Sequence, residues 1–167
     1  MNTAHPLVDL PPSRDDQARD LPEDLRAWVD APDLVHLVFE AAPALQEGRE
    51  GPDLSLVPPG MARTVVTLLV YSYAIGLSSS DEIERQVDLD PELAYLSART
   101  WPSSHTLRQV RRRSRPALQA TLSKLLQLVA HLHGTSFTKA QGPEFFQAAA
   151  QERVDRAVLA DTMALDA

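Results

Sequence analysis

The sequence predicts an all-α fold, and three observations lead to that prediction. Apolar residues recur at helical spacing through most of the chain between Leu21 and Gly134. Residues that start and stop helices flank these periodic segments. No run alternates apolar and polar residues as a half-buried strand would. With 167 residues and 44% hydrophobic content, the chain is long enough for one helical domain with a buried core.

The first expected helices follow an acidic arm. Residues 1–21 contain several prolines and aspartates and no apolar periodicity, so we expect this arm to be disordered or extended. Helical spacing begins near Glu23–Trp28 and continues through Asp33–Ala42, whose first residue is the expected N-cap. The Gly- and Pro-rich residues 46–60 are expected to form a connector.

The most apolar segment, Met61–Ile75, predicts a buried helix that ends at Gly76. Polar residues interrupt it, and it is shorter than the ~20 apolar residues that a membrane span needs, so no membrane association is expected. Two short helices should follow. One is Asp81–Val87, which a serine caps, and the other is Pro91–Ala98, which begins after Asp90.

The second half of the chain predicts two longer helices, Ser104–Arg115 and Ala117–His133, with Pro116 between them. The second carries a leucine-rich stripe, and Gly134 ends it. A further amphipathic helix is expected at Glu144–Leu159, in a segment that either folds back or stays mobile. The expected organisation is therefore an arm at 1–21, a helical domain at 22–134 and a tail at 135–167.

The charge of the chain is distributed unevenly. The net charge is −7, yet the segment from Leu93 to Pro143 contains eight Lys and Arg residues and no Asp or Glu. The rest of the chain holds the other 8 basic residues against all 23 acidic ones, a balance of −15. A polyanion would respond to this local basic segment rather than to the average charge.

The basic residues concentrate on the expected helix Ser104–Arg115. On a helical projection Leu107 and Val110 share the packing face, and most of the arginines gather on the opposite face, which we expect to meet solvent. Small polar residues in the first turn would let the helix end approach base edges and a phosphate, and guanidinium groups bind guanine or phosphate. The predicted DNA-binding residues are Ser104, His105, Arg108, Arg111, Arg112, Arg113 and Arg115. The alternative is a solvated basic face that has no ligand.

Other chemistries lack their residues in this sequence. There is no Cys, no Gly-rich phosphate loop and no nucleophile motif. His131 and His133 have no carboxylate at ligand spacing beside them, and His36 lies within an apolar helix, where a packed side chain is expected. The acidic residues between 81 and 92 lie mainly at helix starts, where they complement the helix dipole. We therefore expect no metal, no cofactor, no catalytic residue and no small-molecule substrate. An aromatic content of 5% also disfavours single-strand binding by stacking.

Two ordered blocks of the chain resemble a known family. Leu68–Arg85 (LLVYSYAIGLSSSDEIER) and Pro102–Arg113 (PSSHTLRQVRRR) are similar in order and spacing to the N-terminal, InsH-type helix-turn-helix domain of insertion-sequence transposases. Val110 and Ser103 depart from the family, which usually has Phe and often has Asp at these positions. The resemblance covers about residues 21–134. It implies a helix-turn-helix unit that recognises the terminal inverted repeats of the element, and a location in the bacterial cytoplasm, associated with the nucleoid.

The resemblance also implies what this chain is not expected to do. Family members continue into an RNase H-like domain with a catalytic Asp-Asp-Glu triad, whereas only 33 residues follow Gly134 here. We therefore expect a non-catalytic protein that binds duplex DNA, derived from a truncated or domesticated element. The alternative is a helical interaction module without DNA binding, in which the leucine-rich stripe of Ala117–His133 pairs with a second copy to form a homodimer.

Overall fold

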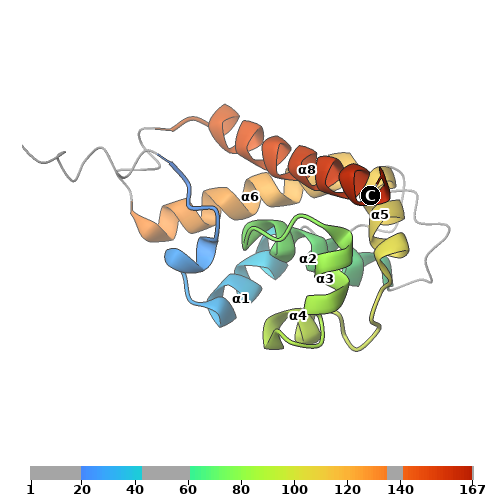
Figure 1. Cartoon of the computed structure of the whole chain (residues 1–167). Helices are drawn as coiled ribbons and strands as arrows, with labels where there is room; N and C mark the ends of the chain where they lie inside the picture. The colour runs from blue at the N-terminus through green and yellow to red at the C-terminus, as the bar shows by residue number, and fades with distance from the viewer. Residues whose placement is uncertain (1–19, 43–60, 135–140, 167) are drawn as a thin grey trace, which may run out of the picture.

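The computed structural model describes residues 20–42, 61–134 and 141–166, and every regular element in these ranges is a helix. The all-α prediction is confirmed. In chain order, the elements are the 3-10 turn η2 (Leu25–Ala27), α1 (Ala31–Ala41), α2 (Met61–Ala74), α3 (Ser80–Gln86), α4 (Pro91–Leu96), α5 (Ser104–Arg113), α6 (Arg115–His133) and α8 (Pro143–Asp166) (Figure 1). The predicted connector at 46–60 and most of the predicted arm, residues 1–19, lie outside the described residues.

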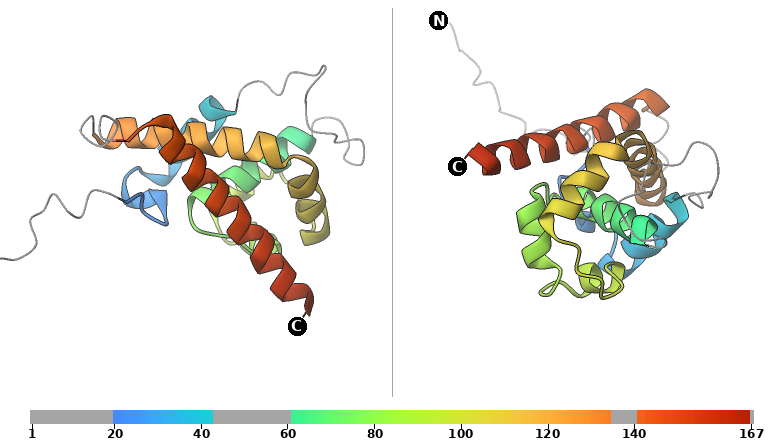
Figure 2. Two further views of the ribbon diagram at one scale, coloured as in Figure 1. Left: turned by 90° about the horizontal axis from the view of Figure 1, so that it is seen from above. Right: turned by 90° about the vertical axis from the view of Figure 1, so that its right-hand side faces the viewer.

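Helix α2 lies at the centre of the fold. All of its residues from Val65 to Ala74 are buried, as the apolar sequence predicts. It packs against α1, α4, α5, α6 and α8, so these helices are arranged around it (Figures 1 and 2). Among the residues of known placement, no helix is long and apolar enough to cross a membrane.

The C-terminal segment folds back onto the domain. Helix α8 runs against α6 in the opposite direction and crosses it at an angle (Figure 2). It contributes four fully or almost fully buried apolar residues to the common core: Phe146, Ala150, Val154 and Ala157. The helix extends to Asp166, beyond the predicted end at Leu159.

The leucine-rich stripe of α6 is part of the same core. Leu118, Leu122, Leu125 and Leu126 are fully buried, because α1, α2 and α8 pack over them. The expectation that this stripe pairs with a second copy is therefore wrong, since the chain itself already covers it. Leu132, near the end of α6, is the exception and remains exposed.

A glycine and an arginine together close the C-terminal end of α2. Gly76 has a left-handed φ of 87°, and the Leu77 N–H bonds to the Ser72 carbonyl, which is the Schellman arrangement. The buried Arg153 of α8 donates to the carbonyls of Tyr73 and Ala74, at 2.8 and 3.3 Å. The same guanidinium binds the carbonyls of Pro22 and Glu23. Arg153 thus ties α2, α8 and the segment before η2 together.

Most predicted helix starts are correct to within one residue. The exceptions are α1, α6, which begins at Arg115 rather than at Ala117, and Glu23–Trp28, where the structure has only the 3-10 turn η2. Ser79, Asp90 and Ser103 accept hydrogen bonds from the first turns of α3, α4 and α5. Helix α1 instead begins at Ala31, so Asp33 lies in its first turn rather than at the N-cap. Pro32 accounts for the earlier start, because the fixed φ of proline suits the first positions of a helix.

Candidate nucleic-acid interface

Helix α5 carries most of the predicted site, and local chemistry sets both of its ends. The Ser103 hydroxyl accepts the Thr106 N–H at 3.2 Å, which caps the start. The chain leaves helical geometry at Ser114 and restarts as α6, with Pro116 in the first turn. Pro116 therefore begins a new helix and does not bend a continuous one. As a result α5 is a short, separate helix.

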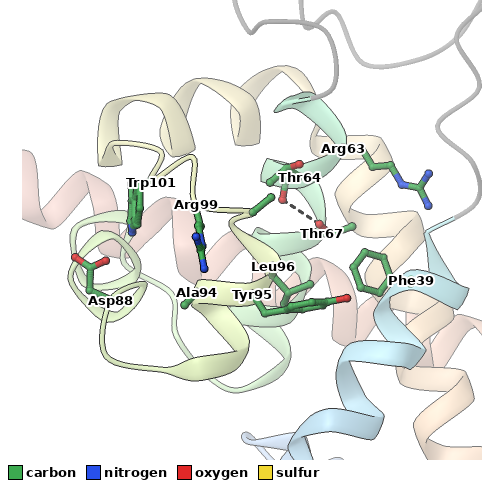
Figure 3. A pocket seen from close by; sticks show the side chains of 11 residues that line it. Phe39, Arg63, Thr64, Thr67, Asp88, Ala94, Tyr95, Leu96, Arg99 and Trp101 are labelled. Atoms are coloured by element: carbon green, nitrogen blue, oxygen red, sulfur yellow. Dashed lines mark hydrogen bonds between the residues drawn. The ribbon is translucent and has the colours of Figure 1, made fainter.

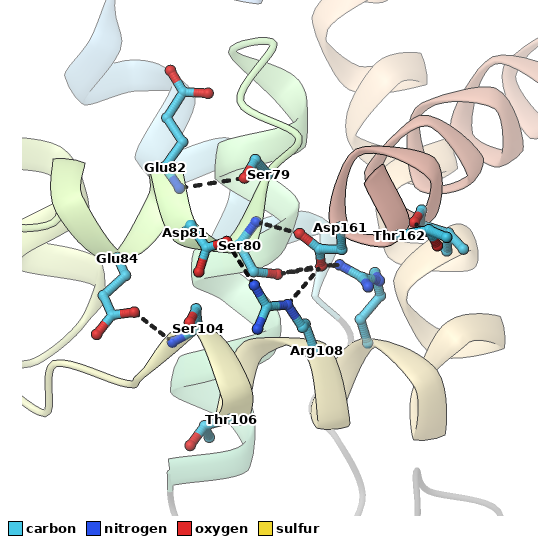
Figure 4. A network of polar contacts seen from close by, with 12 residues as sticks. Ser79, Ser80, Asp81, Glu82, Glu84, Ser104, Thr106, Arg108, Asp161 and Thr162 are labelled. Carbon is cyan, nitrogen blue, oxygen red and sulfur yellow. Dashed lines mark hydrogen bonds and ion pairs between the residues drawn. The ribbon is translucent and has the colours of Figure 1, made fainter. Parts of the chain in front are cut away.

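Most of the stripe predicted to face solvent is engaged in contacts within the protein, and Arg111 is buried. Arg111 is 2% exposed, and its guanidinium donates to the Asp161 carboxylate of α8 and, at 3.2 Å, to the Ser80 hydroxyl of α3. Asp161 also accepts the Ser80 N–H at 2.8 Å and the Ser80 hydroxyl at 2.6 Å (Figure 4). The prediction that Arg111 lies on a solvent-facing surface is wrong, because Asp161 supplies a buried counter-charge from a distant part of the sequence.

Arg108 and Arg115 lie on the same stripe and are also paired. The Arg108 side chain is 13% exposed, and it bonds to Asp81 at 2.7 Å and approaches Asp161 at 3.7 Å (Figure 4). Arg115 forms an ion pair with Asp155 of α8, and both side chains remain partly exposed. The basic segment contains no acids of its own, but α3 and α8 supply them through tertiary contacts.

The N-terminus of α5 also differs from the prediction. The Ser104 N–H donates to a Glu84 carboxylate oxygen at 2.8 Å (Figure 4). This carboxylate occupies the position that the sequence assigned to a phosphate, since both anions suit the positive end of a helix dipole. In this conformation Ser104 is therefore engaged within the protein.

One face of α5 is left on the surface. His105, Arg112 and Arg113 are exposed, and Gln109 is partly exposed between them. The His105 ring nitrogen Nε2 and the Gln109 amide nitrogen lie 2.8 Å apart and share a hydrogen bond. Arg112 has no hydrogen bond or ion pair within the described residues. We call these four residues the α5 outer face.

Of the seven predicted site residues, the structure thus places His105, Arg112 and Arg113 on the outer face and turns Arg108, Arg111, Ser104 and Arg115 toward other elements. Sequence analysis missed Gln109. Its position four residues after His105 was a usable signal, because residues at i and i+4 are neighbours on a helix.

The buried cluster behind α5 changes the acid–base properties of its members. Burial raises the pKa of the Tyr73 hydroxyl to about 12, against the opposing effect of the nearby Arg111. Burial acts to lower the pKa of Arg111, but Tyr73 and Asp161 outweigh it, and the net shift is upward. Arg111 therefore stays charged and serves as the fixed partner of Asp161.

Within residues 20–42, 61–134 and 141–166, no group of three or more His, Asp or Glu residues is arranged to hold a metal ion. Comparison of the chain with protein-family models, with curated proteins and with solved structures gives no match in any of the three.

Proposed function

We propose that this chain is a non-catalytic protein that binds duplex DNA through the α5 outer face. The observation that carries the proposal is that two faces of α5 pack within the protein and a third faces solvent. Two of its stripes are fixed in the protein, by Leu107 and Val110 in the core and by Arg111 in the buried ion pair. The third presents hydrogen-bonding and cationic side chains to solvent.

The outer face has the chemistry of major-groove recognition. Arginine binds guanine and glutamine binds adenine with paired hydrogen bonds, and histidine adds a further donor or acceptor. The seven residue steps from His105 to Arg112 rise about 10.5 Å along the helix, which matches about three base steps. The hydrogen bond between His105 and Gln109 limits the freedom of both side chains before DNA arrives. Arg113, at the end of this face, is placed to contact a phosphate.

The buried ion pair supports this proposal by fixing the position of the helix. Reading base edges requires side chains held in place by their surroundings. Arg111 bonds to α3 and α8 at once, and Arg108 adds a second link to α3. We infer that these two arginines are positioning residues rather than DNA contacts.

The expected salt dependence follows from the number of exposed arginines on the α5 outer face. Arg112 and Arg113 are the two arginines on the outer face, and each phosphate contact contributes about 0.9 to the slope of log affinity against log salt. Two contacts predict a slope of about −1.8. The net charge of −7 opposes a polyanion, so we expect modest affinity for random sequence.

The resemblance of Leu68–Arg85 and Pro102–Arg113 to insertion-sequence transposases supports the same ligand class. On this basis the preferred target would be a terminal inverted repeat, and the protein would act in the bacterial cytoplasm, on the nucleoid, as a regulator or a competitor of a full transposase. A catalytic role is not part of the proposal.

The test is fluorescence anisotropy of a labelled blunt duplex at two or more salt concentrations. The variant Arg112→Ala should weaken binding and reduce the salt slope by about 0.9. The matched control is Arg26→Ala, which removes an exposed arginine of η2, at the other end of the molecule from α5 (Figure 1). The control should leave the slope unchanged. Equal effects of the two variants, or no binding by the folded protein at low salt, would contradict the proposal.

A second candidate function is a protein-interaction module, and one observation favours it. Leu159, Met163 and Leu165 of α8 are each at least 60% exposed. Contiguous exposed apolar side chains mark interaction surfaces, and Leu159 and Met163 are neighbours at i and i+4 on α8. Sedimentation equilibrium tests this candidate. Self-association of the protein that the variant Met163→Ser abolishes would support it.

A further inference from the structure

An open cavity of about 810 Å³ lies beside the loop between α4 and α5. Its walls include Phe39, Tyr95 and Trp101 (Figure 3). These are the three exposed large aromatic side chains of the described residues, at 37%, 68% and 57% exposure. Aromatic content is low, as the sequence shows, yet the exposed members gather at one place. The volume falls in the range of small-ligand sites, about 300–1,000 Å³.

Arg99 presents a cationic group to the cavity (Figure 3). Arg99 extends beside Trp101 in the same direction, and Arg63 lies at the outer edge of the cavity and points away from it (Figure 3). Neither arginine forms an ion pair with any residue that the structure describes. Asp88 is the carboxylate on the wall and can accept a hydrogen bond from an amino group. The site therefore combines flat aromatic surface, unpaired positive charge and one acceptor.

The loop that carries Arg99 and Trp101 is held in an unusual conformation. Ala98, Arg99 and Trp101 have left-handed φ values of 48°, 60° and 41°, and they are the non-glycine residues with positive φ in the described chain. Each such conformation costs on the order of 1 kcal/mol or more, and such strain concentrates at functional sites.

Buried Ser97 fixes this strained loop. Its carbonyl accepts the Thr100 N–H at 2.9 Å and the Thr100 hydroxyl at 2.6 Å. Its own hydroxyl accepts the Arg99 N–H at 3.3 Å. The loop is therefore set in place before any ligand arrives, with Arg99 and Trp101 directed to the cavity.

We propose that this cavity binds an unpaired nucleotide of a DNA strand. The base stacks against the aromatic side chains, an amino group of the base donates to Asp88, and Arg99 binds the adjacent phosphate. Stacking on aromatics with arginine at the backbone is the general chemistry of single-strand recognition. The choice of nucleic acid over an acidic peptide rests on the proposed function, because Trp101 lies three residues before the start of α5.

The test uses Trp101 as its own reporter. The chain has two tryptophans, and Trp28→Phe removes the other, which stacks on His133 away from the cavity. The probes are a cytosine hexadeoxynucleotide and an abasic hexamer of the same charge. The cytosine hexamer should quench Trp101 fluorescence in a saturable way. The abasic hexamer should bind at least about tenfold more weakly.

Variants then assign the contacts. Arg99→Ala should weaken binding of the cytosine hexamer severalfold, whereas the matched control Arg85→Ala, an exposed arginine of α3, should not. Equal binding of the cytosine and abasic hexamers, or no saturable response, overturns the proposal. A stronger response to an acidic peptide than to the cytosine hexamer overturns it in favour of a peptide site.

Blunt-duplex anisotropy on the same preparation separates the two proposals. Duplex binding with no discrimination between the hexamers defeats the cavity proposal alone. Base-dependent quenching without duplex binding defeats the proposed function of the α5 outer face alone.

Discussion

Replacing Asp161 with alanine should destabilise the protein far more than the same change at Asp155. Both aspartates lie on α8 and pair with an arginine of the basic segment, but their surroundings differ. The side chains of Asp161 and Arg111 are each 3% exposed, whereas those of Asp155 and Arg115 are 47% and 44% exposed. The two variants therefore compare a buried with an exposed ion pair on one helix.

The expected loss in the free energy of unfolding depends on which groups lose a partner when each carboxylate is removed. Asp161→Ala removes two hydrogen bonds to Ser80 and leaves the Arg111 charge buried without its counter-ion. Breaking a buried pair in this way costs about 3–5 kcal/mol. Losing an exposed pair costs about 0–1 kcal/mol, which is the expectation for Asp155→Ala. For a chain of this size, the first loss corresponds to a Tm decrease of roughly 6–20 °C.

Urea unfolding followed by far-UV circular dichroism measures both free energies of unfolding. The double variant Arg111→Met/Asp161→Leu is the informative companion, because removing both charges avoids the uncompensated arginine and should recover part of the loss. Similar costs at Asp161 and Asp155, or a double variant less stable than Asp161→Ala, would refute the assignment of a buried ion pair.

Three further predictions concern residues around this cluster. Gly76→Ala should lower the free energy of unfolding by about 1–2 kcal/mol in urea titrations, because φ is 87° and a Cβ would lie 3.2 Å from the Glu23 side chain. An unchanged free energy of unfolding would argue against the left-handed helix end. Tyr73→Phe should reduce alkaline unfolding. The pKa of Tyr73 rises from 10.0 to about 12 on folding, which corresponds to roughly 3 kcal/mol of stability that is complete below pH 10 and is lost as the pH rises toward 12. Over that interval the free energy of unfolding should fall more steeply for the wild type than for the variant. Arg153→Met should cost about 2–3 kcal/mol in thermal or urea unfolding, because four carbonyls lose a charged donor; a loss below about 0.5 kcal/mol would show that water replaces the guanidinium there.

Local signals in the sequence predicted the helices well. Helix caps and left-handed glycines act within three or four residues of their own positions, as at Ser103, Asp90 and Gly76. They can therefore be predicted without knowledge of the fold. Likewise, the uninterrupted burial of α2 follows from its own composition. The apolar stripe of α6 was identified correctly, and only its partner was not, since that partner includes α8.

The orientation of α5 needed tertiary information. A helical projection shows that Arg108, Arg111 and Arg115 share a stripe, but it does not show which stripe faces solvent. Asp161 lies 50 residues beyond Arg111 and 81 residues beyond Ser80, and no local pattern links them. A stretch without acids therefore resembled a free basic surface, although Arg108, Arg111 and Arg115 pair with acids from other helices. The aromatic cavity was missed for the same reason, because Phe39 and Trp101 lie far apart in the sequence and line one cavity only in the folded chain.

The most direct test of the proposed function maps where DNA touches the protein. At 18.4 kDa the chain suits amide and arginine Nε nuclear magnetic resonance spectra, recorded while a blunt duplex is added. We predict shifts at His105, Gln109, Arg112 and Arg113, with the buried Arg111 Nε and the residues of η2 unchanged. Shifts that fall outside α5, or none at duplex concentrations that saturate the anisotropy signal, would contradict DNA binding through the α5 outer face.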